Sequence, residues 1–324
     1  MGKSTRWFEE GAKNLRLVLE RQGRGDLLPP DGVYYTCPCC LTGLYSLGAA
    51  DKLTIEHVPP EILGGRPMLL TCAPCNSNAG ANFDSHADQK VVADAFARGA
   101  EVSRKIRATA YIDGVPLRGT AQSSEDGISI VGVPKQNNRE QQAAFVAMLE
   151  SLVEGDSDAA GRFSFTIHTR FDESRARLSI IRSAYLAAFA ALGWSYILQS
   201  EMQQIRDQLM KLDDAILDTY VFRDPDSATS VRRMILVADP DELRCLAVTI
   251  GEYSVFLPGW PRPKTWDETS ATFGRECEAD GRLNLELKGK EVPWPKKPMY
   301  FLDSPPSSAS QTAKPSDSNS QSTP

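Results

Sequence analysis

Apolar residues recur at intervals of three or four in two segments that we predict to be helices. The first covers 5–22 and has one apolar face, formed by Phe8, Ala12, Leu15 and Leu19. The second begins at Leu178 and continues until Gly193 interrupts the pattern. The aromatic residues of this second helix are expected to lie in a core and not to stack on bases.

Two short apolar runs between Leu53 and Cys72 flank a loop rich in proline and glycine. This pattern predicts a strand, a loop and a second strand. After Asn76 the spacing becomes helical. The apolar positions that would share one face of this helix are Val91, Val92, Ala95 and Phe96. The predicted order of elements is therefore β-β-α.

The remainder of the chain mixes strands and helices. Residues 108–117 alternate around a turn at Asp113 and Gly114, 127–133 adds another strand, and a helical pattern surrounds Phe145. Further strands are expected at 234–238, 246–250 and 253–257. The fold class is therefore α+β, with a small β-β-α unit followed by a mixed α/β carboxy-terminal region.

The chain has 324 residues, which exceeds one average domain, and its 41% hydrophobic content supports a packed core. We expect an amino-terminal unit at 1–105 and an α/β region at 106–303 that selects or positions a substrate. Residues 304–324 are mostly Ser, Pro, Thr, Gln and Asn. Such a segment cannot repay its ordering entropy, so we expect a disordered tail.

The formal net charge of −6 argues against a protein that coats nucleic acid by bulk attraction. A protein that contacts nucleic acid would need basic residues concentrated in one place. The favoured candidate for such a basic surface is 98–107, because this segment would extend the helix after Asn76. We find no apolar segment long enough to span a bilayer and no secretory signal at the amino terminus. We therefore expect a cytoplasmic protein without a membrane partner.

Four cysteines form two Cys-x-x-Cys pairs, Cys37 with Cys40 and Cys72 with Cys75. Each spacing lets two thiolates reach one ion, and two such pairs supply the four soft ligands that tetrahedral zinc prefers. Disulfides are the alternative, but they need an oxidising compartment. Cys39 leaves the ligand choice slightly open, although two adjacent cysteines would be awkward on a single ion. We expect a structural Zn²⁺ ion.

Glu56 and His57 lie between the two cysteine pairs, and Asn76 directly follows the last cysteine. A neutral imidazole, with a reference pKa near ~6.5, is suited to take a proton from an attacking water. Carboxylate and amide oxygens suit Mg²⁺ or Mn²⁺, which would stabilise charge on a departing oxygen. Because adjacent strand residues point to opposite faces, Glu56 and His57 converge only where the strand ends or bends. Pro59 and Pro60 are placed to impose such a bend.

The segments from Glu56 to Gly65 and from Leu70 to Gly80 resemble the zinc-stapled branch of the HNH endonuclease family, which has a treble-clef-like ββα-metal core. The resemblance extends over about 34–90. It implies that His57 is the general base and that Glu56 and Asn76 hold the catalytic divalent cation. The middle asparagine of the family motif is missing, because its position falls near Pro67 or Met68. Glycine and proline pairs could fix that loop through backbone geometry instead.

The resemblance implies a metal-dependent endonuclease that hydrolyses DNA in bacterial or phage DNA processing or defence. The residues do not separate DNA from RNA. One ββα site cuts one strand, so a double-strand break would need a homodimer or two successive events.

Two other functional classes compete with a nuclease. One is a zinc-ribbon protein that binds nucleic acid without cutting it. The other is a zinc-stabilised assembly protein that uses the 178–196 helix as an interface. His86 could contact a phosphate or a metal, but a place on a helix surface is favoured. His168 alternates with apolar residues, so we interpret it as structural.

Overall fold

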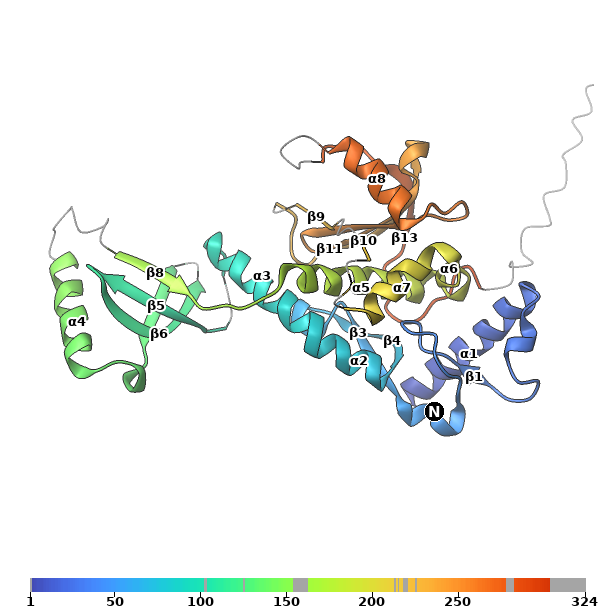
Figure 1. The fold of residues 1–324 in the computed structure, drawn as a ribbon, viewed down its shortest axis with the longest axis horizontal. Helices are drawn as coiled ribbons and strands as arrows, with labels where there is room; N and C mark the ends of the chain where they lie inside the picture. Colours follow the sequence, from blue (N-terminus) through green and yellow to red (C-terminus); the bar gives the residue numbers. More distant parts are fainter. Residues whose placement is uncertain are drawn as a thin grey trace, which may run out of the picture.

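A computed structural model describes residues 2–101, 104–124, 126–153, 163–212, 214, 216–217, 221–224, 226–277 and 283–303. Helix α5 (Glu173–Leu192) lies at the centre of the molecule (Figure 1). Every residue from 178 to 192 is buried, as expected of a helix that other elements enclose on all sides. The helix ends before Gly193, as predicted. Because α5 is enclosed by its own chain, it does not offer an assembly interface, and that alternative is wrong.

The amino-terminal part packs on one side of α5. Helix α1 (Lys3–Arg21) confirms the first predicted helix and buries Phe8, Ala12, Leu15 and Leu19. It packs against β1 (Tyr34–Tyr35), which pairs with β2 (Tyr45–Ser46). The predicted strand, loop and strand are β3 (Leu53–Val58) and β4 (Arg66–Cys72), which form an antiparallel hairpin.

A nearly continuous helical stretch follows the hairpin. It consists of α2 (Ala73–Ala79), a π-helical turn at Gly80–Asp84 and α3 (Ser85–Ala97). Helix α3 buries Val92 and Phe96, in agreement with the predicted apolar face. The helix does not extend through 98–107, however, because Arg98 caps α3 and a new strand begins at Ile106.

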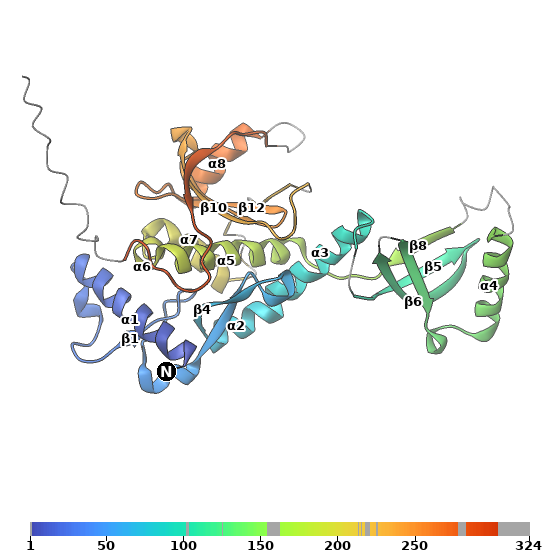
Figure 2. The same cartoon turned by 180° about the vertical axis from the view of Figure 1, so that it is seen from behind.

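A second sheet covers the other side of α5. Its strand order is β13-β10-β11-β12-β9, and all neighbours are antiparallel. The strands are β9 (Val221–Arg223), β10 (Arg232–Asp239), β11 (Cys245–Ile250), β12 (Tyr253–Pro258) and β13 (Lys288–Val292). Helix α8 (Trp266–Glu276) covers the face that α5 leaves free (Figure 2). The short helices α6 (Trp194–Ile197) and α7 (Gln203–Met210) follow α5 in sequence.

The described residues between 106 and 167 project from one end of this body (Figure 1). They form a four-stranded antiparallel sheet of order β7-β6-β5-β8, with helix α4 (Arg139–Val153) beside it. The strands are β5 (Ile106–Ile112), β6 (Val115–Ser124), β7 (Gly127–Gly132) and β8 (Phe163–Ile167). The predicted hairpin at Asp113 and Gly114 is present. Phe145 of α4 packs with Ala110 and Ile112 in a small core of their own.

One hydrophobic core joins the two sides of the body. It includes Trp7 of α1, Leu69 of β4, Phe189 of α5 and Val255 of β12. The sequence-based division after residue 105 does separate the projecting sheet from what precedes it. The chain then returns at α5, however, and completes the same core as 1–101. The predicted tail at 304–324 lies outside the described residues.

Among the described residues, no helix combines the length and the apolar character that a membrane span requires. The longest of the described helices, α5, packs against β3, β4, β11 and β12 of its own chain. Its hydrophobicity is therefore explained by the protein core.

Candidate metal centre and the residues around it

The four cysteines of the two pairs converge. The Sγ atoms of Cys37, Cys40, Cys72 and Cys75 all lie within 4.8 Å of one another. Cys37 and Cys40 belong to the turn after β1, Cys72 ends β4, and Cys75 lies in the first turn of α2. The cluster therefore joins the turn after β1 to the junction of β4 and α2, more than 30 positions later in the sequence.

This arrangement fits zinc. Four thiolates at about 2.3 Å from a tetrahedral Zn²⁺ ion would lie roughly 3.8 Å from one another. The Sγ atoms of Cys40 and Cys72 are 3.9 Å apart. All seven cysteines of the chain are free, so the disulfide alternative is not observed. Cys39 is buried and is not one of the four clustered cysteines, in agreement with the ligand pair Cys37 and Cys40 that the sequence favoured.

The loop between β3 and β4 is held by backbone geometry, as the sequence suggested. Gly64 adopts a φ of 76°, which favours glycine. A Cβ atom on Gly65 would lie 1.5 Å from the carbonyl oxygen of Pro59. The two glycines therefore permit a turn that a side chain at either position would disturb.

Glu56 is buried and has strong partners. Its carboxylate accepts hydrogen bonds from Arg182 of α5, over 2.6 and 3.1 Å, and from the hydroxyl of Thr71 over 2.9 Å. The side chains of Glu56 and Arg182 are each 4% exposed. Burial alone would lower the pKa of Arg182, but neighbouring negative groups, including Glu56, raise it above its usual value. Glu56 is therefore the internal counterion of α5.

His57 differs from Glu56 in its surroundings. It is half-buried, whereas Glu56 is buried, and the register of β3 with β4 shifts between these two residues. Strand β3 continues to Val58, so the bend expected from Pro59 comes after His57 and not before it. The register shift falls where the sequence requires a bend, and the convergence of His57 with Glu56 stays a prediction. Within the described residues, the imidazole forms no hydrogen bond or ion pair.

Asn76 ties α2 to β3. Its Nδ2 atom donates to the hydroxyl of Thr54 over 2.9 Å and to the carbonyl oxygen of Ile55 over 3.4 Å. Thr54 and Glu56 are two residues apart and share a face of β3. The structure thus brings Asn76 to the side of the hairpin that carries Glu56. Among the described contacts, the amide oxygen of Asn76 accepts no hydrogen bond.

The other two histidines have structural partners. The Nδ1 atom of His86 accepts a hydrogen bond from the backbone amide of Asp172 over 2.8 Å, just before α5. The Nε2 atom of His168 lies 2.8 Å from the hydroxyl of Thr109. These contacts agree with the structural roles that the sequence favoured.

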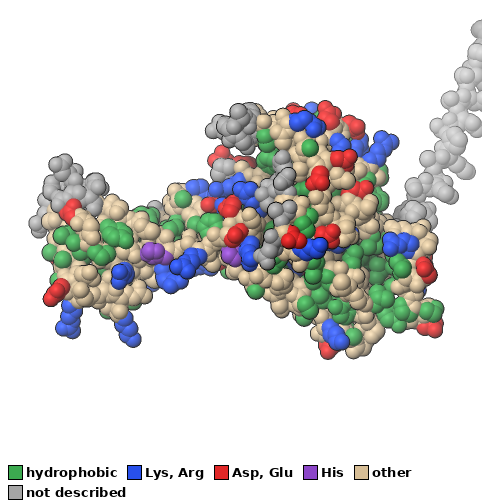
Figure 3. All heavy atoms as spheres, viewed as in Figure 1, with side chains coloured by type: hydrophobic (Ala, Val, Ile, Leu, Met, Phe, Trp, Pro, Cys, Tyr) green, Lys and Arg blue, Asp and Glu red, His purple; other side chains and the backbone are tan. Residues whose placement is uncertain are grey.

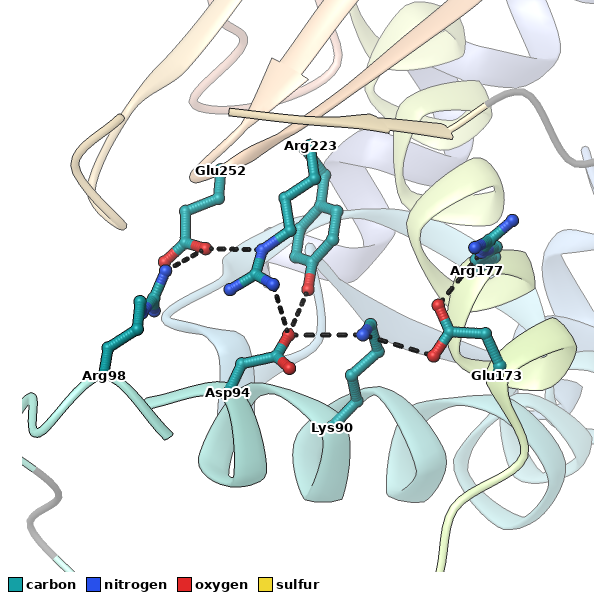
Figure 4. Close-up of polar contacts among 8 residues, drawn as sticks. Lys90, Asp94, Arg98, Glu173, Arg177, Arg223 and Glu252 are labelled. Carbon is teal, nitrogen blue, oxygen red and sulfur yellow. Dashed lines mark hydrogen bonds and ion pairs between the residues drawn. The ribbon is translucent and has the colours of Figure 1, made fainter. Parts of the chain in front are cut away.

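Basic side chains lie close together near the end of α3, but they do not belong to an extension of that helix. On the face in Figure 3, Lys and Arg side chains lie close together where 106–167 joins the body. Arg104 pairs with Asp88 of α3. An ionic network continues along α3, in which Asp94 contacts Lys90 and Arg223, and Glu252 contacts Arg98 and Arg223 (Figure 4). Much of this positive charge is therefore neutralised within the protein.

Sequence reasoning missed two residues that complete the environment of Glu56. Thr71 is one position before Cys72, and Arg182 is the single charged residue in the buried stretch 178–192 of α5. A charged residue within such a helix signals a buried partner, and that signal was present in the sequence. The identity of the partner was not, because 126 positions separate the two residues.

Membership of a known family is not shown. No protein-family model, no curated protein and no solved structure matches this chain. The geometry therefore establishes a four-cysteine site that could hold a metal ion in a mixed α/β protein.

Proposed function

We propose that this protein hydrolyses phosphodiester bonds of DNA with a divalent cation, and that His57 is the general base. The observation that carries the proposal is the placement of Asn76. The cysteine cluster and the hydrogen bonds of Asn76 both fix the start of α2 against β3, the strand that bears Glu56 and His57. The candidate catalytic residues thus come from elements that one metal site fixes together.

In this proposal the residues have separate tasks. The half-buried imidazole of His57 would take a proton from water. The free amide oxygen of Asn76 is a hard donor for Mg²⁺ or Mn²⁺, and such a cation supplies charge stabilisation for the leaving oxygen. Mg²⁺ commonly uses only one or two protein ligands and fills the remainder of its shell with water and phosphate. Two oxygen donors would therefore suffice.

The proposed role of Glu56 as a metal ligand requires a change in its hydrogen bonds. Both of its oxygens accept hydrogen bonds from Arg182 or Thr71. To hold a cation, Glu56 must release at least one of these bonds. The buried position of the pair makes that exchange costly.

This same observation favours a second candidate function, nucleic-acid binding without cleavage. A carboxylate fully used as a counterion leaves the site without an acidic metal ligand. The zinc-stapled hairpin would then present a surface and perform no chemistry.

Plasmid nicking separates the two functions. Supercoiled DNA is incubated with the wild-type protein and Mg²⁺ or Mn²⁺, and with EDTA as the metal-free control. We expect nicking that EDTA abolishes and that His57→Ala reduces by about 10²- to 10⁴-fold. His86→Ala is the matched control and should still cut.

Two other results would contradict this proposal. Undiminished nicking by folded His57→Ala would remove His57 from the mechanism. Salt-sensitive retention of DNA without any nicking would establish the second function.

A further inference from the structure

A cavity of about 980 Å³ lies between the β3–β4 hairpin, helix α3 and the carboxy-terminal sheet. The hairpin contributes Leu63 and Arg66, the sheet contributes Arg232 and Tyr253, and Trp294 follows β13. Small-molecule sites typically measure about 300–1,000 Å³. None of the proposed hydrolytic residues lines the cavity, although Val58, the neighbour of His57, does.

The charged lining of the cavity is unbalanced. Two of its acidic residues, Asp94 and Glu252, are already engaged by basic side chains (Figure 4). Glu101 is the third. Four lining cations form no ion pair with any described residue, and these are Lys3, Arg66, Arg232 and Lys296. The wall therefore carries an excess of positive charge.

Arg232 is fixed in this wall. Its guanidinium donates to the carbonyl oxygens of Thr229, Val231 and Leu63 over 2.9, 2.7 and 2.8 Å. Burial lowers the pKa of Arg232 below its ordinary value. The carbonyl oxygens orient the group without cancelling its charge. A partly buried cation with a fixed orientation and no carboxylate partner is suited to an anionic ligand.

Aromatic side chains form another part of the lining. Tyr253 is buried and donates its hydroxyl to Asp94, which holds its ring in place, and Trp294 is half-buried. Flat apolar surfaces of this kind pack well against a planar ring. The hydroxyl group of Ser230 also lines the cavity and can bind polar edges of a ligand.

We propose that this cavity binds a nucleoside phosphate, with the phosphate at Arg232 and Lys296 and the base against Tyr253 and Trp294. The combination of an anion site and flat walls matches the two halves of that ligand class. The proposal concerns equilibrium binding and does not depend on whether the protein cuts DNA.

Isothermal titration calorimetry of the full chain tests this assignment without added divalent metal. The probes are the four ribonucleoside 5′-monophosphates, their nucleosides and inorganic phosphate. We expect at least one monophosphate to bind at least tenfold more tightly than both its nucleoside and inorganic phosphate. The assignment is overturned if no monophosphate binds, or if inorganic phosphate binds as tightly.

Neighbouring basic residues provide matched variants. Lys296→Glu changes an exposed residue of the cavity wall, whereas Lys297→Glu changes an exposed neighbour outside it. Loss of a charge-assisted contact should weaken binding by about 10- to 100-fold for the first variant only. Arg232→Ala and Arg233→Ala form a second pair, since Arg233 lies outside the cavity and contacts Glu291 at 3.9 Å.

The lysine pair keeps the test decisive even if Arg232→Ala does not fold. Equal affinity of the Lys296→Glu and Lys297→Glu proteins for the monophosphate would overturn the placement of the phosphate. Weaker binding by Lys296→Glu alone would support it.

Discussion

Arg182 and Glu56 form a buried ion pair that joins the central helix α5 to the β3–β4 hairpin. The two distances are 2.6 and 3.1 Å, and Thr71 donates a third hydrogen bond to the same carboxylate. Neither charge is accessible to water. The pair therefore explains how Arg182 is accommodated in the buried stretch 178–192 of α5.

Removing one partner of this pair should be strongly destabilising. Arg182→Met leaves the carboxylate of Glu56 buried and unpaired, so we expect a loss of about 3–5 kcal/mol in the free energy of unfolding. Arg177→Met is the control, because Arg177 and its partner Glu173 are 38% and 44% exposed and such pairs contribute less than about 1 kcal/mol. Urea denaturation measures both. Equal effects would mean that the buried pair is not a structural link.

The cysteine cluster predicts that metal and folding are coupled. Cys72→Ser should lose zinc and unfold the amino-terminal part, because structural zinc contributes folding free energy directly. Elemental analysis and circular dichroism give the two readouts. Cys277→Ser is the control, since Cys277 is half-buried outside the cluster and should leave zinc content unchanged. Purified wild-type protein without bound metal would contradict this prediction.

The lowered pKa of Glu252 predicts that the protein loses stability at acidic pH. Burial raises its pKa, but hydrogen bonds from Arg98 and Arg223 outweigh burial and hold the pKa below the ordinary value. A lowered pKa in the folded state means that Glu252 stabilises the protein above its unfolded-state pKa of about 4.3. That contribution is lost as the pH falls through the folded-state pKa.

Melting temperatures across a pH series check this sign. Glu252→Gln should melt below the wild type at pH 7, and the difference should shrink below about pH 4. Glu291→Gln is the control, because the side chain of Glu291 is 71% exposed. A difference that stays constant with pH would show that charge at Glu252 is not responsible.

The turn between β3 and β4 should not tolerate a side chain at Gly65. A Cβ atom there would collide with Pro59, so Gly65→Ala should cost at least about 1–3 kcal/mol. Gly48→Ala is the control, because a Cβ atom there would lie 3.9 Å from Ser46 Oγ, which is an ordinary van der Waals contact. Thermal denaturation compares the two, and an unchanged Gly65→Ala melting temperature would contradict the observed turn.

The projecting part at 106–167 should be removable. Its two ends meet, because the amide of His168 donates to the carbonyl oxygen of Arg107 over 2.8 Å. A short Gly/Ser linker can therefore replace the segment between them without stretching the body. We expect the shortened protein to keep its zinc and to melt cooperatively. A fragment that ends at residue 105 should instead aggregate, since it lacks α5.

Several features of this protein could be predicted from the sequence because they depend on local pattern. The periodicity of α1 and α5, the break at Gly193 and the β3–β4 hairpin all follow from residue spacing. The cysteine cluster belongs with them, because two Cys-x-x-Cys turns are each preorganised for one ion.

The tertiary structure alone decided which distant residues meet. Glu56 and Arg182, the return of the chain at α5, and the cavity beside Arg232 all join segments that are far apart in sequence. Hydrophobic burial drives such contacts, and it has no direction along the chain. An apolar stripe therefore predicts that a helix is covered, and only the packed molecule shows what covers it.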